Sequence, residues 1–224
     1  IEDQDYEIDI EDNREVHEFK FEKIDESLHF EKTWGPKHPQ AGQPIVLRDY
    51  QVETINKFLE NPQCLQEIAT GAGKTIITAT LSQLVQPYGR SIVIVPNKSL
   101  VTQTEGDYKT LGLDVGVYYG ERKEFDKQHT ICTWQSLNNM LKKTKKFEAE
   151  VSIGDFLQGV VCVMVDEVHQ AKADVLKTLL TGPFATVPIR WGLTGTIPKE
   201  DYEKASLQAS LGEVINKLSA SELQ

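Results

Sequence analysis

Residues 69–75 contain the residue types that a phosphate-binding loop requires. They read Ala-Thr-Gly-Ala-Gly-Lys-Thr and lie between an apolar run, residues 64–68, and a helix-forming run, residues 76–84. The two glycines permit a tight turn that exposes backbone N–H groups to an anion, and the following helix adds its positive end. Lys74 adds a full charge, and the Thr75 hydroxyl is a ligand for Mg²⁺. The predicted phosphate-binding residues are Thr70, Gly71, Ala72, Gly73, Lys74 and Thr75.

An acidic pair, Asp166 and Glu167, supplies the second half of this chemistry. It follows a continuous apolar run, residues 160–165, which is typical of a strand buried on both faces of a parallel sheet. Open α/β sheets bind ligands at the carboxyl ends of their strands. There Asp166 can hold Mg²⁺ at the β- and γ-phosphates, and Glu167 can orient and deprotonate an attacking water. Alone, the pair could simply end a strand and start a turn, but the phosphate-binding loop favours the catalytic interpretation.

From residue 45 onward, strand-length apolar runs alternate with helical patterns. In addition to residues 64–68, strands are predicted at residues 91–95, 115–119, 129–132, 160–165 and 189–193. Helices are predicted at residues 48–59, 76–84, 99–111, 135–142 and 174–180. Alternation at this spacing predicts βαβ units and a mostly parallel sheet between two layers of helices. The expected fold is therefore a three-layer α/β domain of the RecA-like kind.

The acidity of the chain is concentrated near its start. The net charge of the 224 residues is −10, and residues 1–33, with 13 acidic and 4 basic side chains, account for −9 of it. We predict a solvated acidic linker here, with one or two half-exposed strands as the alternative. Residues 35–44 contain three prolines and two glycines and cannot be helical. The predicted units are a leader at residues 1–44 and one domain at residues 45–224. The leader is either an acidic linker or the end of an accessory domain.

Composition excludes several other classes of protein. No apolar run approaches the roughly 20 residues that cross a bilayer, so we expect no membrane partner. Three widely spaced cysteines predict buried free thiols in a reducing cytoplasm (the host's, if a phage encodes the chain), and the five histidines show no ligand spacing. We therefore expect no metal besides Mg²⁺. The first residue is Ile1 rather than methionine, which suggests a piece of a longer protein.

The order of the motifs resembles the first motor domain of superfamily 2 helicases and translocases over residues 47–199. Residues 69–75 resemble the family's motif I. Ile68 stands where a strict Gly-x-x-x-x-Gly-Lys-[Ser/Thr] loop has glycine, which argues against a small GTPase or nucleotide kinase. Asp-Glu-Val-His at residues 166–169 resembles motif II in its DExH form. The chain is most similar to phage UvsW-type repair helicases and to XPB- and RecG-like relatives.

The resemblance implies further contacts to the nucleotide. Leu-Arg-Asp-Tyr-Gln at residues 47–51 resembles the family's glutamine motif, which implies that Arg48 and Gln51 contact adenine. Leu-Thr-Gly-Thr at residues 193–196 resembles motif III, which implies that Thr194, Gly195 and Thr196 couple hydrolysis to movement. His169 would relay between the nucleotide and motif III, or would only cap a strand end. With Lys74, Asp166 and Glu167, it completes the implied catalytic set.

Two more segments resemble those with which the family holds the nucleic-acid backbone. The residues that this likeness implies are Pro96, Asn97, Lys98, Ser99, Gln103, Thr133, Trp134, Gln135 and Ser136. Asn97 or Ser99 can also cap the following helix, and helix starts themselves attract phosphates. For Trp134, packing in the core is the favoured role over base stacking.

A run of four lysines is the one concentrated positive patch of the chain. Lys142, Lys143, Lys145 and Lys146 are expected in a loop. The favoured interpretation is a solvated surface, with contact to phosphates as the alternative.

These likenesses imply an ATP-dependent, Mg²⁺-requiring nucleic-acid motor that acts on DNA rather than RNA, in repair, recombination or replication. The alternatives are a restriction-type DNA translocase, a DExH RNA helicase and, from another class, a nucleotide-gated binding module without turnover. The family uses a second RecA-like domain of the same polypeptide, and residues 212–220 resemble the run-out towards it. That domain supplies arginines worth roughly 10³–10⁵ in rate. We therefore expect negligible stimulated ATP hydrolysis by these 224 residues alone.

Overall fold

Within the part of the chain that the structure describes, the central sheet has eight strands. The computed structural model describes residues 19–28, 30, 32–69, 73–168, 173–195 and 200–218. The strands are β1 (Gln63–Ile68), β2 (Arg90–Val95), β3 (Val115–Tyr119), β4 (Arg122–Lys123), β5 (His129–Thr133), β6 (Val160–Asp166), β7 (Ile189–Thr194) and β8 (Val214–Leu218). They pair in the order β4-β3-β5-β2-β6-β7-β1-β8. Every described pair is parallel except β3 with β4.

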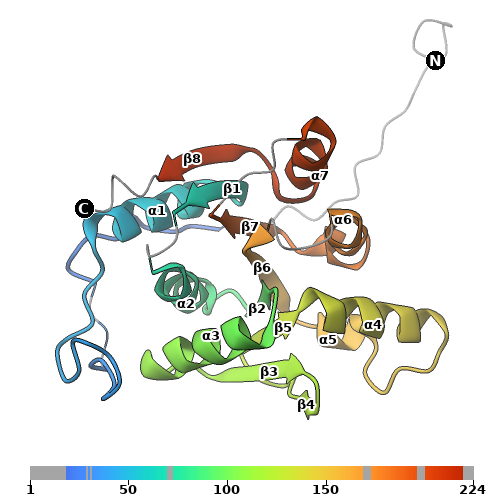
Figure 1. Cartoon of the computed structure of the whole chain (residues 1–224), viewed down its shortest axis with the longest axis horizontal. Coiled ribbons are helices and arrows are strands. Elements are labelled where there is room, and N and C mark those ends of the chain that lie inside the picture. The colour runs from blue at the N-terminus through green and yellow to red at the C-terminus, as the bar shows by residue number, and fades with distance from the viewer. Residues whose placement is uncertain are drawn as a thin grey trace, which may run out of the picture.

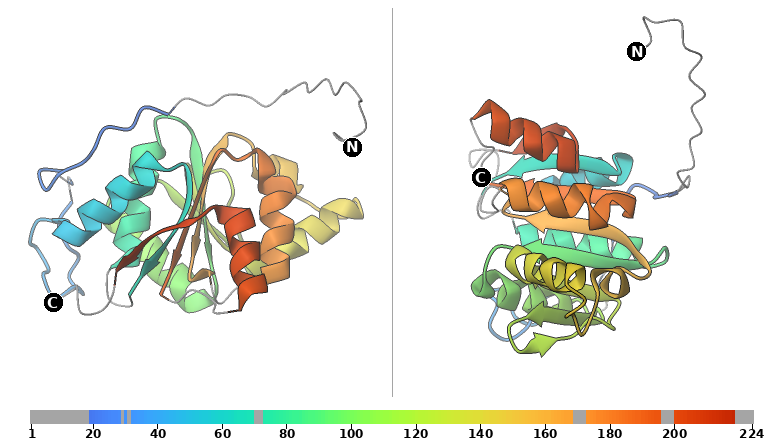
Figure 2. Two further views of the ribbon diagram at one scale, coloured as in Figure 1. Left: turned by 90° about the horizontal axis from the view of Figure 1, so that it is seen from above. Right: turned by 90° about the vertical axis from the view of Figure 1, so that its right-hand side faces the viewer.

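Helices cover both faces of this sheet (Figure 1, Figure 2). They are α1 (Asp49–Glu60), α2 (Lys74–Val85), α3 (Lys98–Thr110), α4 (Trp134–Lys145), α5 (Ile153–Phe156), α6 (Ala173–Thr181), α7 (Asp201–Leu211) and the 3₁₀ helix η3 (Pro183–Thr186). The predicted three-layer, mostly parallel α/β fold is confirmed. No helix in the described ranges is long and apolar enough to span a bilayer.

Alternating residues of each strand serve two separate cores. In β6, Cys162 and Met164 pack with α1, α2 and α3, whereas Val163 and Val165 pack with α4, α5, α6 and α7. This division follows from the two-residue period of a strand, whose successive side chains point to opposite faces. An apolar run without alternation is therefore required for a strand that is covered on both faces.

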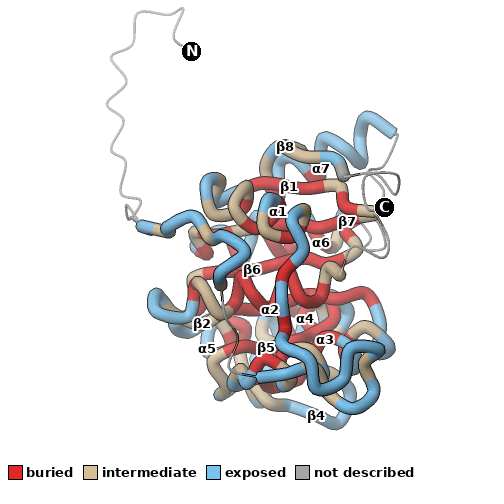
Figure 3. Tube along the Cα trace, turned by 90° about the vertical axis from the view of Figure 1, so that its left-hand side faces the viewer, coloured by how far each residue is buried: buried red, intermediate tan, exposed pale blue. Residues whose placement is uncertain are grey.

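Helix α2 is the most enclosed of these helices. Nine of its twelve residues are buried, since it packs against the sheet, α1 and α3 together. Its sequence is apolar or small on nearly every side, as expected of a helix with no solvent face. The tube coloured by burial shows it in red and tan at the centre of the molecule (Figure 3). This helix begins at the phosphate-binding loop, so the loop is attached to the most buried helical element.

The predicted elements from residue 45 onward are confirmed, with shifts of at most three residues at their ends. The expectation that the four lysines lie in a loop is wrong for Lys142, Lys143 and Lys145, because α4 continues to Lys145; Lys146 follows its end. Leu137, Met140 and Leu141 bury one face of α4, and burial of an amphipathic face stabilises a helix. Cations are also favoured near a helix C-terminus.

The described part of the leader packs against the domain without forming a helix or strand of its own. The rings of Phe19 and Phe21 each meet the ring of Tyr88 edge to face, at 5.3 Å between centroids. The side-chain amide of Asn56 exchanges two 2.9 Å hydrogen bonds with the backbone of Ile24. An isolated bridge joins Thr33 to Pro44. The domain boundary at residue 44 remains a prediction.

The last described strand, β8, is joined to α7 by a glycine whose backbone excludes other residues. Gly212 has φ +95° and ψ −173°, a conformation that is available almost only to glycine. A Cβ atom there would lie 2.4 Å from the carbonyl oxygen of Gln63 in β1. This turn lets β8 pair in parallel with β1 at the edge of the sheet.

We predict that Gly212→Ala lowers the free energy of unfolding by about 1–3 kcal/mol, through backbone strain and displacement of β8. Gly106→Ala is the matched control, because Gly106 is exposed within α3 and a Cβ there meets nothing within 4 Å. It should raise stability by up to about 1 kcal/mol. Urea denaturation of both variants measures the difference, and equal midpoints would contradict the prediction.

Candidate functional site

The carboxyl ends of the parallel strands bring the predicted chemical residues to one edge of the sheet. Strands β5, β2, β6, β7 and β1 are successive neighbours. Register pairs Asp166 of β6 with Leu193 of β7, and Thr194 of β7 with Glu67 of β1. The end of the phosphate-binding loop, the acidic pair and the start of motif III therefore lie together, although they are far apart in the sequence.

Lys74 lies between the two predicted carboxylates. Its ammonium group makes an ion pair with Glu167, and its Nζ is 4.0 Å from Oδ1 of Asp166. The Lys74 side chain is 10% exposed and that of Asp166 is 3% exposed. Burial lowers the pKa of Lys74, while the charge of Asp166 raises it and so offsets part of this effect. The structure thus brings together a cation and two carboxylates away from solvent.

Two residues of this site have left-handed backbone. Gly73, the residue before α2, has φ +70°, and a Cβ there would lie 2.5 Å from Nε2 of Gln51. The backbone conformation therefore favours glycine, and any other residue would also displace the amide end of the Gln51 side chain. Glu167 has φ +52° although it is not glycine. Such strain typically costs on the order of 1–3 kcal/mol and is concentrated at functional sites.

Thr75 contacts a residue of α3 that the sequence analysis did not identify as part of the site. Its hydroxyl donates a hydrogen bond to the carboxylate of Asp107 in α3. Burial raises the pKa of Asp107, and the hydrogen bond from Thr75 and the charge of His38 act in the opposite direction. No motif marks Asp107, since it reaches the site only because α3 packs beside α2.

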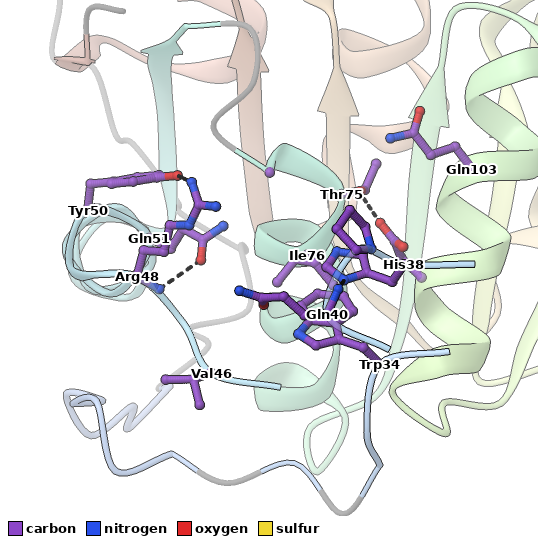
Figure 4. A pocket seen from close by; sticks show the side chains of 13 residues that line it. Trp34, His38, Gln40, Val46, Arg48, Tyr50, Gln51, Thr75, Ile76 and Gln103 are labelled. Atoms are coloured by element: carbon purple, nitrogen blue, oxygen red, sulfur yellow. Dashed lines mark hydrogen bonds between the residues drawn. The ribbon is translucent and has the colours of Figure 1, made fainter. Parts of the chain in front are cut away.

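A cavity of about 370 Å³ opens next to Gly73 and Thr75. The start of α1 forms one side of it: Arg48 Nη1 donates to the hydroxyl of Tyr50 at 2.9 Å, and the Arg48 backbone N–H donates to Oε1 of Gln51 at 2.9 Å (Figure 4). The predicted adenine contacts, Arg48 and Gln51, therefore lie beside the phosphate-binding loop, as their likeness to the glutamine motif implies.

The opposite side of the cavity comes from the connector at residues 34–40, which sequence reasoning assigned no role. Trp34 and His38 stack with ring centroids 3.8 Å apart and an interplanar angle of 8°. Both line the cavity, as does Gln40 (Figure 4). The sequence offers one signal of this contact: Trp34 precedes a polar, proline-containing stretch. A large aromatic side chain there is not expected to belong to the core and can therefore indicate a binding surface.

The two segments with predicted nucleic-acid contacts lie side by side, because β2 and β5 are paired with Val95 opposite Thr133. Asn97 caps α3 by accepting from the N–H of Leu100 at 3.0 Å. Thr133 caps α4 by accepting from the N–H of Ser136 at 3.2 Å, so the side-chain oxygens of Asn97 and Thr133 already stabilise a helix start. Nε2 of Gln135 donates to the carbonyl of Pro96 at 3.5 Å and so joins the two segments.

The remaining predicted site residues lie in different surroundings. Lys98 and Ser99 are exposed next to Asn97, and Trp134 is half-buried against the core. Gln103 lines the cavity, as do Gln51, Gly73 and Thr75. Thr194 is buried and Gly195 half-buried at the end of β7. Outside the described residues lie Thr70, Gly71, Ala72, His169 and Thr196.

Comparison with known families and proteins adds to this geometry. Residues 44–199 match the family model described as "Type III restriction enzyme, res subunit". The chain is 26% identical over 187 residues to the "DNA 3'-5' translocase XPB2" of Sulfurisphaera tokodaii, a match that covers 83% of this chain and 38% of the relative. It is 22% identical to the "ATP-dependent DNA helicase uvsW" of Enterobacteria phage T4, over 78% of this chain and 34% of that protein.

Solved structures share the fold. A crystal structure of T4 UvsW superposes with a TM-score of 0.67 at 18% identity, covering 86% of this chain and 37% of that one. The helicase domain of Pyrococcus furiosus Hef gives a TM-score of 0.61 at 21% identity, covering 77% and 38%. The chain spans 38% and 34% of the two curated relatives named above.

Proposed function

The chain belongs to the family described as "Type III restriction enzyme, res subunit", and from this membership we propose that it hydrolyses ATP as part of a nucleic-acid motor. Membership also confirms the resemblance to superfamily 2 helicases that the motifs indicate. The observation that carries the proposal is the contact of Lys74 with Glu167 and its approach to Asp166 at the carboxyl edge of the sheet. A phosphate-binding lysine and two strand-end carboxylates are the groups that phosphoryl transfer to water needs.

In the proposed site, Lys74 exchanges its carboxylate partners for the phosphates of ATP. The hydroxyl of Thr75 and the carboxylate of Asp166 are oxygen ligands of the kind that Mg²⁺ prefers, so the residues present fit this ion. When bound, Mg²⁺ neutralises charge on the phosphate oxygens. To reach it, Thr75 would turn its hydroxyl away from Asp107. Glu167, released from Lys74, would then orient the attacking water and accept its proton.

The cavity beside Gly73 is the proposed site of the base. Its volume of about 370 Å³ lies in the range of small-ligand pockets. Arg48 and Gln51 would supply hydrogen bonds to adenine, and the stacked pair of Trp34 and His38 would supply an aromatic wall. The leader at residues 1–44 would in that case contribute to nucleotide binding as well as precede the domain at residues 45–224.

The proposed substrate track is DNA, because the curated relatives named above are a DNA translocase and a DNA helicase. Exposed groups at the starts of α3 and α4, namely Asn97, Lys98, Ser99 and Gln135, would contact the sugar–phosphate backbone together with Pro96, Gln103, Thr133, Trp134 and Ser136. The segment of Thr194, Gly195 and Thr196, with His169, would couple hydrolysis to movement. A second RecA-like domain of the same polypeptide would complete the ATP site and the track.

Two other functions are tested by the same experiments. A restriction-type translocase would move on duplex DNA without separating strands, so unwinding and translocation assays distinguish it from a helicase. A nucleotide-gated binding module would bind ATP but not hydrolyse it. The presence of both Asp166 and Glu167 beside Lys74 favours turnover.

We predict that Lys74→Ala abolishes binding of Mg·ADP, because the phosphates lose their only flexible counter-charge. Isothermal calorimetry measures the affinity, and circular dichroism checks that the variant remains folded once two carboxylates have lost their cation. Lys204→Ala is the control, since Lys204 is exposed and belongs to α7, a helix that contains none of the predicted site residues. Unchanged affinity in Lys74→Ala would mean that the phosphate site lies elsewhere.

We predict that Glu167→Gln retains ATP binding but loses turnover by on the order of 10²–10⁴-fold, because the amide cannot accept the proton of water. Steady-state phosphate release should be measured with DNA present, on the polypeptide that includes the second motor domain. If the variant hydrolyses ATP at the parent rate, another residue must be the base. A parent protein that binds ATP and never turns over would instead support the binding module.

We predict that Trp34→Ala weakens ADP binding about tenfold, since loss of an aromatic contact of this type is worth on the order of 1 kcal/mol or more. Trp34→Phe should recover most of the affinity because it keeps a ring against the base. Inorganic pyrophosphate, which has no base, should bind both variants as it binds the parent. Equal loss of ADP and pyrophosphate affinity would show that Trp34 acts through folding.

A further inference from the structure

A continuous stripe of polar and positive side chains runs along the exposed face of α4. Gln135, Asn139, Lys142 and Lys146 follow one another at spacings of four, three and four residues, and all four are exposed. At 100° per residue these positions lie within about 60° of one another around the helix axis. The stripe begins at a residue of the proposed nucleic-acid track and extends about 16 Å away from it.

The lysines at the far end of the stripe have no carboxylate partner in the described part of the chain, unlike several lysines elsewhere on its surface. Lys57 is paired with Glu53, Lys109 with Glu105 and Lys23 with Glu60. No ion pair of the described residues involves Lys142, Lys143, Lys145 or Lys146, and α4 contains no acidic residue. In a chain of net charge −10, these four charges therefore remain available to an external anion.

An aromatic side chain stands at the end of the same stripe. Phe147 is 98% exposed and has φ +57°, a backbone conformation that is strained for a bulky residue. Figure 1 shows the C-terminal end of α4 and the loop after it at the periphery of the domain. Favourable contact of lysines with the helix C-terminus explains cations here, but it does not explain an exposed ring beside them.

The acidic residues of the following loop do not cancel this charge. Glu148 and Glu150 leave residues 134–150 with a net charge of +2, from four lysines and two glutamates. Burial and, to a smaller extent, the charge of Glu150 raise the pKa of Tyr118 in β3.

We propose that Lys142, Lys146 and Phe147 form a contact for single-stranded nucleic acid, which continues the track that starts at Gln135. Basic side chains along a line bind successive phosphates, and an exposed ring accepts an unpaired base by stacking. A duplex offers the same phosphates but no unpaired base, so the ring selects a single strand. This inference rests on the proposed function, because it extends the substrate track of the same motor.

The test compares variants of the 224-residue chain for binding to a fluorescent single strand of about 16 nucleotides and to a blunt duplex of that length, by anisotropy. Lys142→Gln/Lys146→Gln should weaken single-strand binding on the order of tenfold. Because two phosphate contacts are lost, it should also lower the slope of log affinity against log salt by about 1.4. Phe147→Ala should weaken single-strand binding about tenfold with an unchanged slope, and should leave duplex binding as it was.

Lys177→Gln/Lys204→Gln is the matched control, because it removes the same charge from exposed positions of α6 and α7. The inference is overturned if this control matches the α4 double variant in affinity and slope, or if Phe147→Ala affects duplex and single strand equally. If the α4 variants bind the single strand as tightly as the parent chain does, and also bind Mg·ADP, the proposed contact at α4 is refuted while the proposed nucleotide site stands. A parent chain that binds neither DNA nor Mg·ADP would refute the proposed function instead.

Discussion

The site depends on the position of one ammonium group between two carboxylates in a nearly solvent-free place. Charges that are taken out of water are costly unless they are paired, and the cost falls on whichever group lacks its partner. Here Lys74 forms an ion pair with Glu167, and its Nζ lies 4.0 Å from Oδ1 of Asp166. A phosphate group with its divalent cation has the complementary arrangement of charges and can enter by exchanging partners. Burial thus makes the site selective for a ligand that brings both a negative and a positive part.

The parallel sheet makes this arrangement possible, because it places the ends of distant segments at one edge. The same edge holds the starts of α2, α3 and α4, each with free N–H groups in its first turn. At α3 and α4, the side chains of Asn97 and Thr133 satisfy some of these groups. At α2, Gly73 has no side chain to do so, which leaves the N–H groups there to an anion.

Much of the fold and the centre of the site could be predicted from the sequence. Buried strands are marked by uninterrupted apolar runs such as residues 160–165, and the phosphate-binding loop is marked by its glycines and lysine, because both signals are local. Asp107, Trp34 and His38 could not be predicted, since they reach the cavity only through tertiary packing. Helix α4 extends three residues beyond the predicted helix, because a run of lysines in a sequence does not distinguish a loop from the last turn of an amphipathic helix, where cations are favoured.

The enclosure of α2 has a mechanical consequence. A helix that is buried on nearly every side cannot rotate or slide without repacking the sheet, α1 and α3 at once, and close-packed interiors resist such changes. In the proposed complex, the phosphates of the nucleotide would therefore be held against a stiff support. The connector of Trp34 and His38 belongs to none of the described helices or strands, so a change in nucleotide state would be expressed more readily there than in α2. The phosphate end of the proposed ligand would then meet the most enclosed helix, and its base end would meet a segment outside the sheet and helices.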